Sequence, residues 1–102
     1  MSVAERALRS KLARIVTRRG LVRGSLLVRR RVCGKTRCKC AGGQLHQSLY
    51  LVVTQGGRTR QLYVPKAWEG RVRQWAMDYQ RIRHLLEELS QIHWQKVHNR
   101  QD

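Results

Sequence analysis

Apolar residues recur every three or four positions near the start of the chain, which predicts an amphipathic helix from Val3 to Arg19. Ser2 suits the N-cap of this helix and Gly20 ends it, so residues 1–20 form an N-terminal helical segment. Its apolar face is expected to carry Leu8, Leu12, Ile15 and Val16.

The stretch from Gly24 to Cys33 alternates with a period of two, which is typical of a strand. One face of this strand carries Leu26, Val28, Arg30 and Val32. The other face carries Leu27, Arg29 and Arg31.

A β-hairpin is predicted from Leu49–Thr54 and Arg58–Val64, which flank Gln55, Gly56 and Gly57. Two glycines suit a primed two-residue turn, because such a turn needs positive φ. Pairing Gln55 with Arg58 sets the register. One face then joins Leu49 to Val64, Leu51 to Leu62 and Val53 to Arg60, and the other joins Tyr50 to Tyr63, Val52 to Gln61 and Thr54 to Thr59. We expect the first face, which is apolar, to lie on a helix, and the second to face solvent or a ligand.

A long helix is predicted after Pro65, over residues 66–98. Its apolar residues step by four and three positions in alternation, which is the pattern of a heptad seam. At ~1.5 Å per residue the helix would be about 50 Å long, so its far half must pack on the N-terminal helix or on a second chain. The seam residues are Trp68, Val72, Trp75, Tyr79, Ile82, Leu86 and Leu89.

Together these elements predict an α+β fold in a single domain, residues 1–102. The order is the N-terminal helix, a three-stranded antiparallel sheet with a cysteine-rich loop over residues 24–64, and the long C-terminal helix. A core of this size is modest, so a metal or a partner chain would help to stabilise it.

The charge of the chain is strongly and unevenly positive. It has 22 Lys and Arg against 6 Asp and Glu, and residues 1–64 hold 15 of the basic residues with Glu5 as their one acid. A field of this strength requires an anionic partner, and a phosphate backbone is the usual one. The candidate nucleic-acid contacts are Arg29, Arg31, Lys35, Arg37, Lys39, Arg58 and Arg60.

A membrane is a weaker candidate partner, because the arginines are spread over helix, strand and loop positions instead of one amphipathic face. No stretch approaches the roughly 18 apolar residues of a membrane span, and the first residues contain no apolar signal region. We therefore expect a cytoplasmic protein that associates with the nucleoid and not with a membrane.

Three cysteines and one histidine follow the spacing C-x4-C-x-C-x5-H. Three thiolates and one imidazole can complete a tetrahedral zinc site, and nearby cations favour the ionised thiols. The alternatives are three reduced thiols beside a surface histidine, or a redox switch. The expected zinc ligands are Cys33, Cys38, Cys40 and His46.

The stretch from Gly24 to Pro65 resembles a family of small, basic bacterial proteins of unknown function. The resemblance rests on Gly24-Ser25-Leu26, Cys33-Gly34-Lys35, Cys38, Cys40, Leu45-His46, Tyr50, Gly57-Arg58, Arg60 and Tyr63-Val64-Pro65-Lys66. Family members often occur beside transposable-element genes, so the resemblance implies a role in DNA mobility. The family usually follows the histidine with Gly-Pro-Tyr, whereas this chain has Gln47-Ser48-Leu49.

A looser similarity links the expected fold to the arm-binding domains of tyrosine recombinases, which also present a basic three-stranded sheet backed by a helix. This similarity is one of fold and implies nothing about individual residues.

Three functions fit these observations. The leading hypothesis is a DNA-binding accessory protein of a mobile element, which contacts duplex DNA through the basic sheet and the zinc-stapled loop. The second is RNA binding of the ribosomal type, with Tyr50 and Tyr63 stacking on bases. The third is a coiled-coil adaptor that forms a homodimer or binds a recombinase or transposase subunit.

An enzyme is not expected. Most of the six acids sit at helix-surface spacings typical of salt bridges. No nucleophile is paired with a base, and no glycine-rich phosphate loop precedes a helix. The sequence therefore predicts no catalytic residue.

Overall fold

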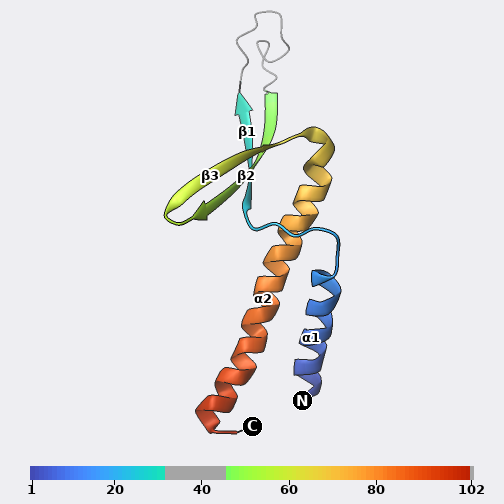
Figure 1. Cartoon of the computed structure of the whole chain (residues 1–102), viewed down its shortest axis with the longest axis vertical. Helices are drawn as coiled ribbons and strands as arrows, with labels where there is room; N and C mark the ends of the chain where they lie inside the picture. Colours follow the sequence, from blue (N-terminus) through green and yellow to red (C-terminus); the bar gives the residue numbers. More distant parts are fainter. Residues whose placement is uncertain (32–45, 102) are drawn as a thin grey trace, which may run out of the picture. The chain divides into compact units, whose positions relative to one another are not determined.

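The computed structural model describes residues 1–31 and 46–101, and gives no side-chain detail for Arg31 and His46. The chain folds as predicted into an α+β structure, in which one helix precedes a three-stranded sheet in the sequence and one long helix follows it (Figure 1). The elements are α1 (Val3–Val16), β1 (Ser25–Arg31), β2 (His46–Gln55), β3 (Arg58–Val64), the short 3-10 helix η2 (Lys66–Trp68) and α2 (Glu69–Asn99).

Helix α1 begins as predicted and ends three residues early. The hydroxyl of Ser2 accepts a hydrogen bond from the backbone N–H of Glu5 at 3.1 Å, which caps the first turn. At the other end, the Thr17 hydroxyl donates to the carbonyl of Ala13 at 2.8 Å. A hydroxyl that bonds the backbone in this way competes with the helical ladder, so the helix stops at Val16 and not at Arg19.

The sheet has the order β1-β2-β3 with antiparallel pairs throughout. The predicted hairpin register is confirmed, from Leu49 opposite Val64 to Gln55 opposite Arg58. Gly56 and Gly57 have φ values of 58° and 77°, the positive values that a primed turn demands.

The pairing of β1 with β2 defines the two faces of the sheet, because directly opposite residues share a side. Arg29 lies opposite Ser48 and Leu27 opposite Tyr50, whereas Val28 lies opposite Leu49. The tyrosine face therefore carries Ser25, Leu27, Arg29, Ser48, Tyr50, Val52, Thr54, Thr59, Gln61 and Tyr63. The helix face carries Leu26, Val28, Arg30, Gln47, Leu49, Leu51, Val53, Gln55, Arg58, Arg60, Leu62 and Val64.

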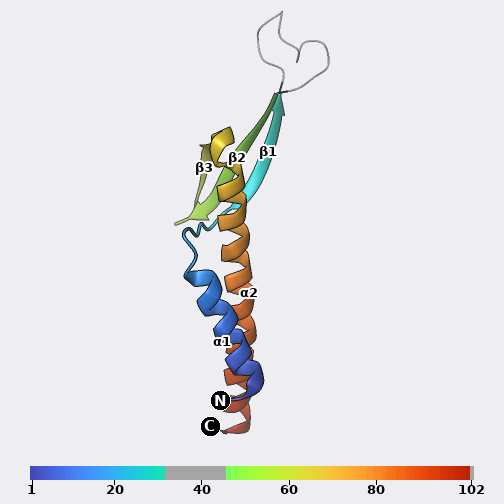
Figure 2. The same ribbon diagram turned by 90° about the vertical axis from the view of Figure 1, so that its right-hand side faces the viewer.

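The first turns of α2 cover part of the helix face, as predicted (Figure 2). Leu49, Val64 and Val72 form a buried cluster, against which Leu26 and Leu51 pack. Residues 23–76 make up one compact part of the chain, which we call the sheet unit.

A second cluster joins α1 to the far half of α2. Leu8, Ile15 and Leu85 are buried there, and the residues packed around them are Leu12, Ile82, Leu89 and Ile92. The two helices lie alongside each other in both views (Figures 1 and 2). The far half of α2 thus packs on the N-terminal helix, one of the two alternatives that its length left open. Residues 1–22 and 77–102 make up this helical unit.

The buried residues of α2 depart from the predicted heptad seam at two positions. Leu86 is 50% exposed and Leu85 is buried in its place, while Trp68 is 42% exposed and belongs to the short helix η2. In the far half of α2, the stripe that packs on α1 consists of Ile82, Leu85, Leu89 and Ile92. Successive residues of a helix are about 100° apart, so Leu86 falls beside this stripe and stays exposed.

None of the described helices is both long enough and apolar enough to cross a membrane.

Candidate nucleic-acid interface

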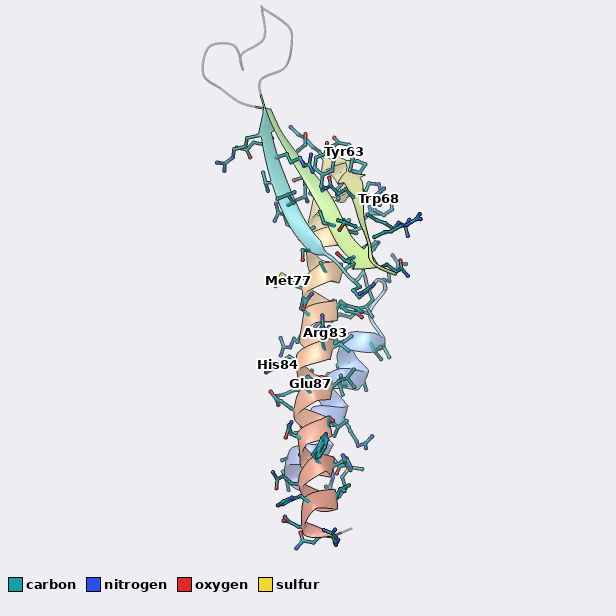
Figure 3. The ribbon with its side chains drawn as sticks, turned by 90° about the vertical axis from the view of Figure 1, so that its left-hand side faces the viewer. Tyr63, Trp68, Met77, Arg83, His84 and Glu87 are labelled. Carbon is teal, nitrogen blue, oxygen red and sulfur yellow. The ribbon has the colours of Figure 1, made fainter. Side chains whose placement is uncertain are left out.

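The centre of the tyrosine face holds an arginine stacked on an aromatic ring. The guanidinium carbon of Arg29 lies 5.0 Å from the ring centroid of Tyr50, within the range of a cation–π contact. The ring of Tyr63 meets that of Tyr50 edge to face, with centroids 5.9 Å apart. Tyr63, which is labelled in Figure 3, is 52% exposed.

A glutamine on the far strand holds the same arginine. The Nη2 group of Arg29 donates a hydrogen bond to the side-chain carbonyl of Gln61. Arg29 comes from β1, Tyr50 from β2 and Gln61 from β3, so all three strands contribute to one arrangement. Together the two contacts hold an exposed guanidinium over the ring of Tyr50.

The residues predicted to bind nucleic acid do not all share this face. Arg29 lies on it, whereas Arg58 and Arg60 lie on the helix face, where both are exposed. Arg31 occupies the ladder position opposite His46. Lys35, Arg37 and Lys39 lie outside the described residues.

The basic charge of the chain is concentrated in the sheet unit. Residues 23–76 hold twelve lysines and arginines and one acid, Glu69. In the described part of this unit, no ion pair joins Arg30, Arg58 or Arg60 to an acid. These cations are therefore available to an anionic partner.

The chain matches the model of a known protein family. Residues 3–74 match the model of a family described as a domain of unknown function (DUF6788). The chain belongs to this family. No curated protein and no solved structure matches the chain. The match to DUF6788 takes in α1, all three strands and the start of α2, so it contains the whole tyrosine face.

The predicted zinc ligands of this DUF6788 member fall where the structure gives no side chains. Cys33, Cys38 and Cys40 lie outside the described residues, and His46 is described only as the first residue of β2. Elsewhere in the described chain, no three His, Cys, Asp or Glu side chains are grouped closely enough to hold a metal ion. The zinc site stays a prediction.

A second aromatic cluster, which the sequence did not predict, forms at the start of α2. The rings of Trp68 and Trp75 meet edge to face with centroids 6.1 Å apart, and the guanidinium carbon of Arg71 lies 4.4 Å from the Trp68 ring. Both tryptophans were expected in the heptad seam. Trp68 (Figure 3) is instead 42% exposed, so it lies at the surface of the chain.

Two acids of the DUF6788 chain are buried, whereas the sequence predicts most of the six at helix surfaces. Glu5 and Asp78 are 4% and 3% exposed. The Glu5 carboxylate accepts from Arg9 at 2.9 Å and lies 3.6 Å from His93 and 3.7 Å from Lys96. The hydrogen bond from Arg9 holds the pKa of Glu5 below its ordinary value, against the opposing effect of burial.

Asp78 is held across the helical unit. Its carboxylate accepts from Arg18 at 2.9 Å, which joins the residues after α1 to α2. The outer surface of α2 follows the predicted pattern, since His84 and Glu88 are 2.8 Å apart at i,i+4 spacing. The buried acids thus serve to pair the helices. These pairs could not be predicted from the sequence, because each acid also contacts residues that are far from it in the chain.

Proposed function

We propose that this protein binds duplex DNA through the tyrosine face of its sheet, as an accessory protein of a mobile element. The observation that carries the proposal is the exposed guanidinium of Arg29 at the centre of that face. The mobile-element setting rests on the resemblance to proteins encoded beside transposable elements. We expect the protein to be found with the nucleoid.

The charge of the sheet unit supports a nucleic-acid partner. Twelve cations and one acid in 54 residues repel one another unless an anion neutralises them. A nucleic-acid backbone carries phosphates at regular spacing, and their neutralisation releases counterions into solution. An antiparallel ribbon or sheet is also one of the structures that enter a DNA groove.

The contacts within the tyrosine face favour duplex over single-stranded RNA. Single strands are bound mainly by stacking successive bases on aromatic rings. The guanidinium of Arg29 already covers the ring of Tyr50, so a base would have to displace it. The half-exposed ring of Tyr63 could still stack on one base, which keeps RNA as the second candidate. A single exposed ring is not enough to bind several successive bases.

Zinc remains part of the proposal through Cys33, Cys38, Cys40 and His46. Arg31, the last residue of β1, pairs with His46, the first residue of β2. A zinc ion bound by these four residues would cross-link the end of β1 to the start of β2 and stabilise that end of the sheet. Purified protein should contain about one zinc per chain by elemental analysis. Substituting Cys38 and Cys40 by serine should remove it.

A homodimer is also proposed, through the exposed apolar side chains of α2, of which only Leu86 belongs to the predicted seam. Helix α1 covers the seam positions Ile82 and Leu89. The exposed large apolar residues of α2 are Met77, Leu86, Trp94 and Val97, at 65%, 50%, 65% and 71%. Sedimentation of the purified protein at two concentrations would show whether these residues pair two chains or receive a recombinase or transposase subunit.

We propose no catalytic activity. The two buried acids of the described chain, Glu5 and Asp78, are both engaged by arginines. A nuclease that used metal ions would require acids gathered at one place. Incubation of the protein with plasmid DNA and Mg²⁺ should leave the DNA intact.

Two neighbouring arginines provide the test of the proposed face. Arg29 and Arg30 carry equal charge and are both exposed, but they lie on opposite faces. Affinity for a duplex is measured over a range of salt concentrations for the wild type, Arg29→Ala and Arg30→Ala. We expect Arg29→Ala to weaken duplex binding at every salt concentration, whereas Arg30→Ala leaves the affinity near the wild-type value.

Equal effects of the two substitutions would contradict the assignment of the tyrosine face. Single-stranded RNA of the same length is titrated in parallel. Tighter binding of RNA than of duplex DNA would replace the leading function with the second one.

A further inference from the structure

We propose that Arg29 reads guanine in the major groove, and that Gln61 and Tyr50 act as positioning residues which hold its guanidinium for that contact. This inference rests on the proposed function. It goes further by assigning the recognised base and by separating this arginine from those that meet phosphates.

The pairing of the strands shows how far the Arg29 side chain reaches. Arg29 lies opposite Ser48, and Gln61 lies opposite Val52, with Tyr50 between them on the same face of β2. To reach Gln61, the side chain must cross the central strand diagonally, over the ring of Tyr50. The guanidinium is thus placed at the middle of the face and not at its edge.

The two contacts occupy one of the N–H donors that lie in the plane of the guanidinium. A guanidinium has five N–H donors in that plane, and Gln61 takes one from Nη2. The ring of Tyr50 lies under the guanidinium carbon, at 5.0 Å from its centroid, and takes no N–H donor in a hydrogen bond. Donors that remain in the plane match the N7 and O6 acceptors of guanine, the commonest specific partner of arginine in the major groove.

A phosphate contact would not require this arrangement. Phosphates can be met by flexible cations from many directions, and the sheet unit contains eleven other lysines and arginines. The side chains of Arg30, Arg58 and Arg60, on the helix face, have no hydrogen-bond or ion-pair partner within the described residues, so exposed cations of this unit are not held in place as a rule. Fixing a long side chain before binding lowers the entropy lost on binding, which benefits a directional contact most.

The test uses a duplex selected by the wild-type protein from a random library. Copies of this duplex carry 7-deazaguanine at one guanine at a time, which removes the N7 acceptor and keeps the charge. For at least one guanine, wild-type affinity should fall about tenfold, since a bidentate pair contributes strongly to discrimination. Arg29→Ala should bind the two duplexes almost equally.

Two further variants separate the recognition of guanine by Arg29 from the contribution of its positive charge to affinity. Arg29→Lys keeps the positive charge but loses the planar fork, so its salt slope should match the wild type while its response to 7-deazaguanine is lost. Gln61→Ala should keep the salt slope and the unfolding temperature, and its discrimination at that guanine should fall several-fold. A residue that only stabilised the fold would change the unfolding temperature instead.

Each contrary outcome has a distinct meaning. Tight duplex binding without an enriched guanine, or an equal loss on 7-deazaguanine in wild type and Arg29→Ala, would overturn the inference and leave the proposed function standing. Suppose that Arg29→Lys no longer distinguishes guanine from 7-deazaguanine but Gln61→Ala distinguishes them as well as the wild type does. That result would overturn the positioning role of Gln61. No binding of any duplex would overturn the proposed function itself.

Discussion

The helical unit and the sheet unit use their charged residues in opposite ways. The helical unit holds ten basic residues and five acids, and its two buried acids bind arginines within the unit. The sheet unit holds twelve basic residues and one acid. Its best-held arginine, Arg29, is bound by a neutral glutamine and a tyrosine ring, which orient the charge without neutralising it.

This difference separates stabilising charges from binding charges. In the helical unit, buried carboxylates compensate arginines, so the positive charge helps to hold two helices together. In the sheet unit, a protein carboxylate at Arg29 would compete with an external anion, and a neutral partner does not. The comparison predicts that substitutions in the helical unit change stability, whereas substitutions on the tyrosine face change binding.

The largest effect should come from the core of the helical unit. Leu85 is 5% exposed and its neighbour Leu86 is 50% exposed. Leu85→Ala should lower the free energy of unfolding by about 3 kcal/mol, because it leaves a cavity between α1 and α2. Leu86→Ala, the matched control, should lower it by less than about 0.5 kcal/mol. If a denaturant titration showed equal losses of unfolding free energy for the two variants, the heptad seam predicted from the sequence would be supported instead.

The buried acid of the same unit should have the next largest effect. Asp78→Asn removes the charge that Arg18 faces at 2.9 Å, and we expect a loss of about 1–2 kcal/mol. The value lies below that of a fully buried pair because the Arg18 side chain is 53% exposed. A double-mutant cycle with Arg18→Ala should give a coupling near 1 kcal/mol. A coupling of zero would mean that this pair contributes nothing to stability.

Acid should weaken the helical unit through Glu5. The Arg9 hydrogen bond lowers the pKa of Glu5 in the folded protein, and the charge on Lys96 acts in the same direction. The stabilisation is therefore full above the ordinary glutamate pKa of about 4.3, and it is lost as the pH falls through the lower folded value. Thermal unfolding followed over this pH range should show the loss.

Glu5→Gln is the control for this pH dependence. The variant should be less stable at neutral pH and should respond less to acid below about pH 4.3. An identical acid response in the variant and the wild type would assign the effect to other carboxylates.

The smallest effect is expected at the end of α2. Arg100 has a φ of 51°, a left-handed conformation that glycine adopts without strain. Its N–H donates to the carbonyl of Val97, and the N–H of Gln101 donates to that of Lys96, so the residue closes the helix. Arg100→Gly should stabilise the helical unit by about 0.5–1 kcal/mol in thermal unfolding without a change in duplex affinity beyond one lost charge.

The fold could be predicted from the sequence wherever local chemistry decides it. Gly56 and Gly57 fix the turn, and the alternation of the flanking residues then fixes the register of the hairpin, which is confirmed pair by pair. Ser2 fixes the start of α1 for the same reason. The end of α1 was wrong by three residues, because the Thr17 hydroxyl, and not Gly20, closes the last turn.

The candidate site could be predicted only in part, because it depends on contacts between distant strands. The charge pattern drew attention to Arg29, and the hairpin register already placed Gln61 beside Tyr63 and Tyr50. The register of β1 against β2 was missing, since no short turn joins the two strands. Without that register, the sequence could not predict that Arg29 contacts Gln61 or that Arg29 and Arg60 lie on opposite faces of the sheet.

The central claim is that the tyrosine face, and not the helix face, meets the DNA, and side-chain methyl NMR tests it most directly. Leu27 and Val28 are neighbours with nearly equal exposure, 42% and 44%, on opposite faces. On titration with a duplex, we predict that the methyl resonances of Leu27 and Val52 shift, while those of Val28 and Leu62 stay in place. Shifts at Val28 and Leu62 with none at Leu27 would contradict the account.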